Sequence, residues 1–320
     1  MATILSFITL LCTIIICSIQ SKPFPISFSI SETKIVQTIP LKDKDFASLI
    51  PGDSSTYVYE HEEDYYKDYQ RSFYAITGKK GGWDCLRHYE ILANGCIPYF
   101  IDIDHCPPDT MKIFPKELIK KAMNLSGVSY GNIDHHIFDE KAYYEILNEL
   151  LSYTKEHLTT QSVARSLLDS MGYSGKGRIL FLSAKKEDIF PDYLKMCVLI
   201  GLKEIAGDNI IDFPKLEYLY TNYQHNIKGL YGKGFSYTKI LPDLPVNREN
   251  IVNRIKHKEF ELIIHAHTHK GCMLAETIKR CYPPEKIAYL DGEDEHFDCP
   301  YAHLPNYFLR EYQAYRKRHH

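Results

Sequence analysis

The sequence predicts an α/β protein with two Rossmann-like lobes that face a central cleft and follow an N-terminal apolar segment. Short apolar strand patterns alternate with helical patterns along most of the 320 residues, which is typical of parallel sheets covered by helices. The alternation stops at a linker over 174–177, Ser-Gly-Lys-Gly, and begins again after it. The length suits about two domains of ~150 residues each. We therefore predict one lobe over 23–173 and a second over 174–320.

The first residues form an apolar stretch that carries no charge between positions 2 and 21. A stretch of about 20 apolar residues is long enough to span a bilayer. It lacks the basic start of most signal peptides. We predict that residues 1–22 are a signal anchor or a signal peptide, with residues 2–21 in contact with a membrane and the chain membrane-associated or in the secretory pathway. The alternative is a buried core helix that ends at Pro23 and Pro25.

The expected elements of the first lobe follow from apolar periodicity and from stop signals. Asn94-Gly95 ends a helix, because glycine accepts the left-handed conformation there. The pattern predicts helix 61–71, strand 73–77, helix 84–93, strand 96–102, helix 114–125 and helical structure over 139–170.

The second lobe repeats this order of strands and helices. The pattern predicts strands at 178–183, 209–213, 261–267 and 286–290, with helices at 191–206, 247–257 and 272–281. Ligands of doubly wound sheets bind beyond the carboxyl ends of the strands. Candidate site residues are therefore those that directly follow each strand.

The overall charge excludes one class of function. The formal net charge is −3, whereas a protein that binds the phosphate backbone of nucleic acid normally has a clear basic excess. We therefore expect no nucleic-acid partner.

The loop after strand 73–77 has the chemistry of a diphosphate site. Lys79, Lys80, Gly81 and Gly82 precede a helix N-terminus, where cationic side chains, accessible amides and the helix dipole favour an anion. The alternative is a tight turn, because the loop matches neither the P-loop nor the GxGxxG pattern.

Arg87 and Glu90 are three residues apart and are therefore neighbours on the surface of the following helix. Arg87 can bind phosphate bidentately, and Glu90 can accept hydrogen bonds from ribose hydroxyls. The alternative is an exposed ion pair worth a few tenths of a kcal/mol.

The segment 56–102, and above all GWDCLRHYEILANGCIP at 82–98, resembles the nucleotide-sugar lobe of exostosin-like glycosyltransferases. The resemblance implies the B-type glycosyltransferase fold and a metal-independent reaction. It implies that Glu90 binds ribose or sugar hydroxyls and that Arg87 and Lys79 neutralise the leaving diphosphate. The predicted donor-binding residues are therefore Lys79, Gly81, Gly82, Arg87 and Glu90.

The second half is similar to the acceptor lobe of the same family. The similarity lies at RILFLS (178–183), LYGKGFSY (230–237), FELII (260–264) and YLDGED (289–294). Family members have this lobe first and the donor lobe second, so the two lobes are in permuted order here. A permuted chain is compatible with the tolerance of termini and linkers to rearrangement.

Sugar transfer with inversion requires a base that accepts the proton of the acceptor hydroxyl. His269, Asp291 and Asp294 follow predicted strands, where they would open into the cleft. We predict that one of these three is the catalytic base, without ranking them.

His265, His267 and His269 alternate, which would place three imidazoles on one face of a strand. With nearby carboxylates they would form the metal centre of a hydrolase. The other alternative is that these histidines lie in the core or line the cleft.

Together these patterns predict a metal-independent glycosyltransferase with no cofactor. It would move a hexosyl or pentosyl group from a nucleotide-sugar donor to a hydroxyl of a glycan or protein acceptor. Two alternatives stay open: a catalytically degenerate protein that binds sugar or nucleotide, and a metal-dependent hydrolase.

Overall fold

The computed structural model describes residues 22–183, 192–268, 271–294 and 299–312, and it confirms the α/β class with parallel sheets. In this part of the chain the larger sheet has the strand order β1-β11-β10-β9-β7-β8, and its pairs are parallel. Its strands are β1 (Phe24–Pro25), β7 (Arg178–Leu182), β8 (Ile210–Phe213), β9 (Phe260–His265), β10 (Ile287–Asp291) and β11 (Tyr307–Leu309). Parallel pairing of this kind is compatible with a Rossmann-like fold.

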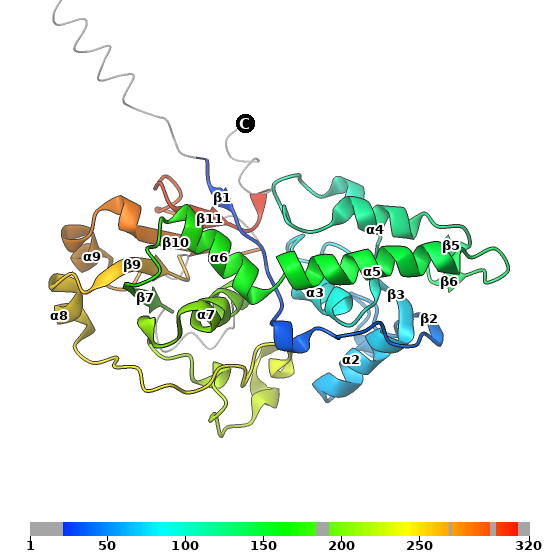
Figure 1. The fold of residues 1–320 in the computed structure, drawn as a ribbon, viewed down its shortest axis with the longest axis horizontal. Helices are drawn as coiled ribbons and strands as arrows, with labels where there is room; N and C mark the ends of the chain where they lie inside the picture. The colour runs from blue at the N-terminus through cyan, green and yellow to red at the C-terminus, as the bar shows by residue number, and fades with distance from the viewer. Residues whose placement is uncertain (1–21, 184–191, 269–270, 295–298, 313–320) are drawn as a thin grey trace, which may run out of the picture.

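A smaller parallel sheet with the order β2-β3-β4 lies at the other end of the molecule (Figure 1). Its strands are β2 (Lys44–Phe46), β3 (Ser72–Thr77) and β4 (Ile97–Phe100), and a hairpin of β5 (Val128–Ser129) and β6 (Asn132–Ile133) lies nearby. Every residue of β3 is buried, as expected of a parallel strand with both faces covered.

The helices cover these sheets at nearly the positions that the sequence predicts. They are α2 (Glu62–Arg71), α3 (Leu86–Ala93), α4 (Lys116–Met123), α5 (Glu140–His157), α6 (Thr160–Ser170), α7 (Tyr193–Ala206), α8 (Ile251–Lys256) and α9 (Ala275–Cys281). The helical stretch at 139–170 is divided because Thr159 caps α6 and accepts a hydrogen bond from the Ser162 amide.

Two segments that the sequence assigned to the first lobe, β1 and α6, contact elements of the second half of the chain. β1 pairs with β11, and the Ile26 amide donates to the Leu309 carbonyl at 3.2 Å. Helix α6 packs on α7, where a Cβ at Gly201 would collide with the Thr160 carbonyl. Glycine at 201 therefore lets the two helices approach closely.

One apolar cluster runs through both sides of the molecule, since it includes Leu92 of α3 and Leu199 of α7. Residues 1–21, to which the prediction of an anchor or signal peptide applies, lie outside the described residues. Among the described residues we find no helix with the length and hydropathy needed to cross a membrane.

Candidate functional site

Two adjoining cavities lie between the smaller and the larger sheet. The aromatic cavity has a volume of about 350 Å³ and is bordered by six aromatic side chains from both halves of the sequence: Tyr57, Tyr59, Tyr65, Tyr193, Tyr231 and Phe235. The acidic cavity has a volume of about 370 Å³ and is bordered by four carboxylates: Asp84, Asp192, Glu293 and Asp294. Lys80, Cys85, Leu86, Tyr193 and Tyr231 line both cavities, so we treat the two as one cleft.

The cleft lies at the carboxyl ends of strands from both sheets. The loop after β3 supplies Lys80 to Leu86, and the residue two positions beyond β9 is His267. The segments after β10 and β11 supply Glu293 and Arg310. Parallel sheets bind ligands at this edge, so the position of the cleft is that of a binding site.

Arg87 is a largely buried cation in the wall of the aromatic cavity. Its guanidinium donates to the Tyr57 hydroxyl at 3.1 Å and lies 5.6 Å from the centre of that ring. Among the described residues no carboxylate forms an ion pair with Arg87, and its buried Nε has no hydrogen-bond acceptor. A guanidinium stays charged at any physiological pH, so this site favours an anionic ligand.

Two further features make the same wall attractive to an anion. Lys80 lines the aromatic cavity and lies near the Tyr57 ring as Arg87 does, whereas Lys233 also lines the cavity but is already paired with Glu60 at 2.6 Å. Cys85 and Leu86, at the N-terminus of α3, line it as well, and the side chain of the N-cap residue Cys85 forms no capping hydrogen bond. The exposed amides and dipole of a helix N-terminus attract negative charge.

Glu90 is buried and connects α3 to the loop that follows α7 and β8. Its carboxylate accepts a hydrogen bond from Tyr65 at 2.8 Å and another from Ser236. Burial raises the pKa of this carboxyl, against the lowering effect of those two bonds. Glu90 lines the aromatic cavity beside Arg87 but makes no ion pair with it among the described contacts.

The Gly81-Gly82 turn lines the acidic cavity rather than the cationic wall. A Cβ at Gly82 would lie 2.5 Å from Glu311 Oε1, and one at Gly81 would collide with the Asp294 carboxylate. The turn therefore packs against carboxylates of the chain itself. Lys79 is exposed and is not among the residues that line either cavity, so its predicted role stays a prediction.

The predicted base candidates have different surroundings. Asp294 lines the acidic cavity, is half exposed and pairs with Arg310. Asp291 is buried at the end of β10, where the Tyr307 hydroxyl donates to it. His269 lies outside the described residues. The structure also brings His267 into this cavity, with its Nε2 at 3.2 Å from Glu293 Oε1.

The alternating histidines do not share one environment. His265 is buried in the core and stacks on Tyr289, with ring centres 5.2 Å apart, whereas His267 borders the cleft. Among the described residues no group of three or more His, Cys, Asp or Glu side chains has an arrangement that could hold a metal ion.

Burial makes His265 a source of acid sensitivity, because it lowers the pKa of the imidazole to about 4. The unfolded chain takes up the proton near pH 6.5, so the free energy of unfolding falls as the pH drops from 6.5 towards 4. We expect His265→Phe to reduce this slope by about 1 kcal/mol per pH unit, measured by urea unfolding at a series of pH values. Parallel profiles for the variant and the unmodified protein would contradict this.

The sequence analysis did not predict a polar cluster beside the acidic cavity, which consists of Asp84, Asp294, Arg310 and Glu311. The Asp84 amide donates to Glu311 Oε1 at 2.8 Å, and the Asp84 carboxylate accepts from the Phe28 amide and the Tyr89 hydroxyl at 2.7 Å each. Arg310 joins the cluster through its pairs with Asp294 and Glu311. The sequence analysis did not predict β11. With that strand, Arg310 and Glu311 would have been predicted at the carboxyl end of a strand, where ligand sites lie.

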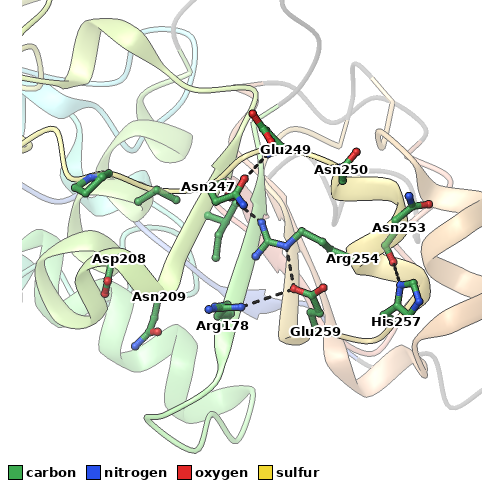
Figure 2. Close-up of a pocket in the computed structure, with 13 residues that line it drawn as sticks. Arg178, Asp208, Asn209, Asn247, Glu249, Asn250, Asn253, Arg254, His257 and Glu259 are labelled. Carbon is green, nitrogen blue, oxygen red and sulfur yellow. Dashed lines mark hydrogen bonds and ion pairs between the residues drawn. The ribbon is translucent and has the colours of Figure 1, made fainter.

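A third cavity of about 560 Å³ lies at the opposite, amino-terminal edge of the larger sheet (Figure 2). Arg254 donates to Glu259 at 3.0 Å, and Arg178 reaches the same carboxylate at 3.7 Å. Its cations are thus already paired with a carboxylate of the wall. Because parallel sheets bind ligands at the carboxyl edge, we assign the candidate site to the cleft.

The fold is that of an α/β protein with parallel sheets, and the cleft at the carboxyl ends of their strands is its candidate ligand site. Comparison of the chain with protein-family models, curated proteins and solved structures gave no match. Its function is therefore inferred from the chemistry of the cleft.

Proposed function

We propose that the protein is a glycosyltransferase of the two-lobed B type, which moves a sugar from a nucleotide-sugar donor to a hydroxyl acceptor in the cleft. The observation that supports it most is Arg87, a largely buried cation that forms no ion pair with a carboxylate among the described residues. It stands in an aromatic cavity at a helix N-terminus. A nucleoside diphosphate combines the anion and the aromatic ring that such a cavity can bind.

The donor would occupy the aromatic cavity. Arg87 and Lys80 would bind the diphosphate, and the dipole of the α3 N-terminus would favour its negative charge. The nucleobase of the donor would stack among the aromatic rings of the wall. Glu90 would accept hydrogen bonds from ribose or sugar hydroxyls. Fixed cations and dipoles of this kind stabilise the charge that develops on a leaving diphosphate.

The acceptor would enter from the adjoining acidic cavity. The acceptor oxygen forms a bond to the anomeric carbon while the bond from that carbon to the diphosphate oxygen breaks. The nucleoside diphosphate leaves with the electron pair, and the hydroxyl proton passes to a base of the protein. Asp294 and the His267–Glu293 pair, which border this cavity, are candidates for that base.

Turnover tests the proposal. The full chain is incubated with UDP-, GDP- and dTDP-sugars and a mixture of saccharide acceptors, and released nucleoside diphosphate is measured with and without EDTA. Release that depends on acceptor and survives EDTA is expected. Binding of a donor without any release would contradict the transferase and would favour a degenerate binding protein.

A further inference from the structure

We infer that the acidic cavity is the acceptor subsite and that it binds hydroxyl-rich saccharides without acidic groups in preference to uronic, sulfated or phosphorylated ones. This inference rests on the proposed function, because it assigns the second cavity of the same cleft. It goes further by naming the chemical class of the acceptor.

The charge of the cavity wall is the first support. Of the described residues that border the cavity, four are carboxylates and two are cations, Lys80 and Arg310. Arg310 is already paired with Asp294 and Glu311, so the charges of Arg310 and Asp294 largely cancel, and the other three carboxylates still outnumber Lys80. Lys80 is exposed at the border with the aromatic cavity. An acidic saccharide would therefore meet like charges, which disfavours it.

The second support is a buried acceptor atom. Asp192 caps α7 by accepting a hydrogen bond at its Oδ1 from the Leu194 amide at 2.9 Å. Its Oδ2 is buried and has no hydrogen-bond donor among the described residues. Buried polar atoms are normally hydrogen-bonded, so this wall favours a ligand that brings a donor, such as a saccharide hydroxyl or amine. A carboxylate or sulfate group on the ligand has no proton to give.

Aromatic side chains at the junction of the two cavities favour a sugar ring in particular. The rings of Tyr193 and Tyr231 have centres 5.7 Å apart and line both cavities. Tyr231 is 60% exposed, so its ring is available to pack against a ligand. Apolar ring faces beside a set of carboxylate acceptors suit a neutral polyol, which has C–H faces and hydroxyl donors.

A matched pair of ligands tests the inference. Methyl β-glucoside and methyl β-glucuronide differ only in a CH₂OH group against a carboxylate. Both are titrated into the full chain, with and without UDP, and binding is followed by saturation-transfer NMR. We expect the glucuronide to bind at least about tenfold more weakly at low salt, and the ratio to decrease in high salt.

Charge-neutral variants of the wall give the decisive comparison. Asp294→Asn and Glu293→Gln should each reduce the ratio to a few-fold, whereas Asp169→Asn, at an exposed carboxylate on α6, should leave it unchanged. Equal or tighter binding of the glucuronide would overturn the inference. The inference would also be overturned if neither cleft variant changed the ratio of the two affinities, or if neither saccharide bound. Failure of every nucleotide to bind would instead contradict the proposed function, and the titrations without UDP would still decide the acceptor class.

Discussion

Replacing Arg310 with methionine is expected to lower the free energy of unfolding by about 3–5 kcal/mol, because it leaves buried carboxylates without their cation. The side chain of Arg310 is 1% exposed. Its guanidinium donates to the Gly292 carbonyl and to Glu311, both at 2.9 Å, and also to Asp294 and the Asp84 carbonyl. It therefore joins the ends of β10 and β11 to the loop before α3.

The pH dependence of this loss identifies its cause. Burial already raises the pKa of the Glu311 carboxyl to about 7, although Arg310 acts to lower it. Without Arg310 that pKa rises further, so the variant must keep an uncompensated buried charge or take up a proton. The loss of stability should therefore be smaller at pH 5 than at pH 8.

Urea unfolding of Arg310→Met and of a control variant, Arg71→Met, measures this effect. Arg71 pairs with Asp43 at 2.9 Å, but both side chains are about half exposed, at 55% and 51%. An exposed pair contributes about 0–1 kcal/mol, so the control should change little. Similar small losses of unfolding free energy in both variants would show that Arg310 does not stabilise the polar cluster of Asp84, Asp294 and Glu311.

The second large effect is expected at Arg87. Arg87→Ala should weaken binding of the nucleotide-sugar donor by about 10- to 100-fold, because a charge-assisted hydrogen bond contributes roughly 1.5–3 kcal/mol. Arg87→Lys should recover only part of the affinity, since an ammonium cannot bind phosphate bidentately. The measurement is calorimetric titration of each variant with the donor that binds the unmodified protein.

Lys79→Ala is the matched control for Arg87→Ala. Lys79 lies in the loop that leads into α3 and carries the same charge, but it is exposed and lines neither cavity. We expect it to change the donor Kd by less than about threefold. A loss as large as that of Arg87→Ala would place the diphosphate over the Lys79–Gly82 loop, as the sequence predicts, and away from the aromatic cavity.

The sequence pattern predicted β3, β4, β7, β8, β9 and β10, whereas it did not predict β1, β2 or β11. β3 and β7 are continuous apolar runs, because both faces of a parallel strand are covered. β1 has only two residues, one of them Pro25, and it exists because β11 supplies its partner. β2 consists of Lys44, Asp45 and Phe46, whose side chains carry no strand pattern.

The candidate site was predictable to the extent that it is local in sequence. Arg87 and Glu90 border the cleft because they lie on the first turns of a helix that follows a strand. The partners of this segment come from far along the chain: Glu90 contacts Ser236, and Asp84 contacts Arg310 and Glu311. Spacing within one sequence gives no information on such contacts. The same limit explains why Gly81 and Gly82 read as a phosphate turn, although they pack on carboxylates.

Calorimetric titration of the full chain with UDP-, GDP- and dTDP-sugars tests the donor site most directly. We predict saturable binding of donors that share one nucleotide, with an affinity that EDTA does not change. If a protein shown to be folded binds none of these donors, the aromatic cavity is not a nucleotide-sugar site and the proposed function is contradicted.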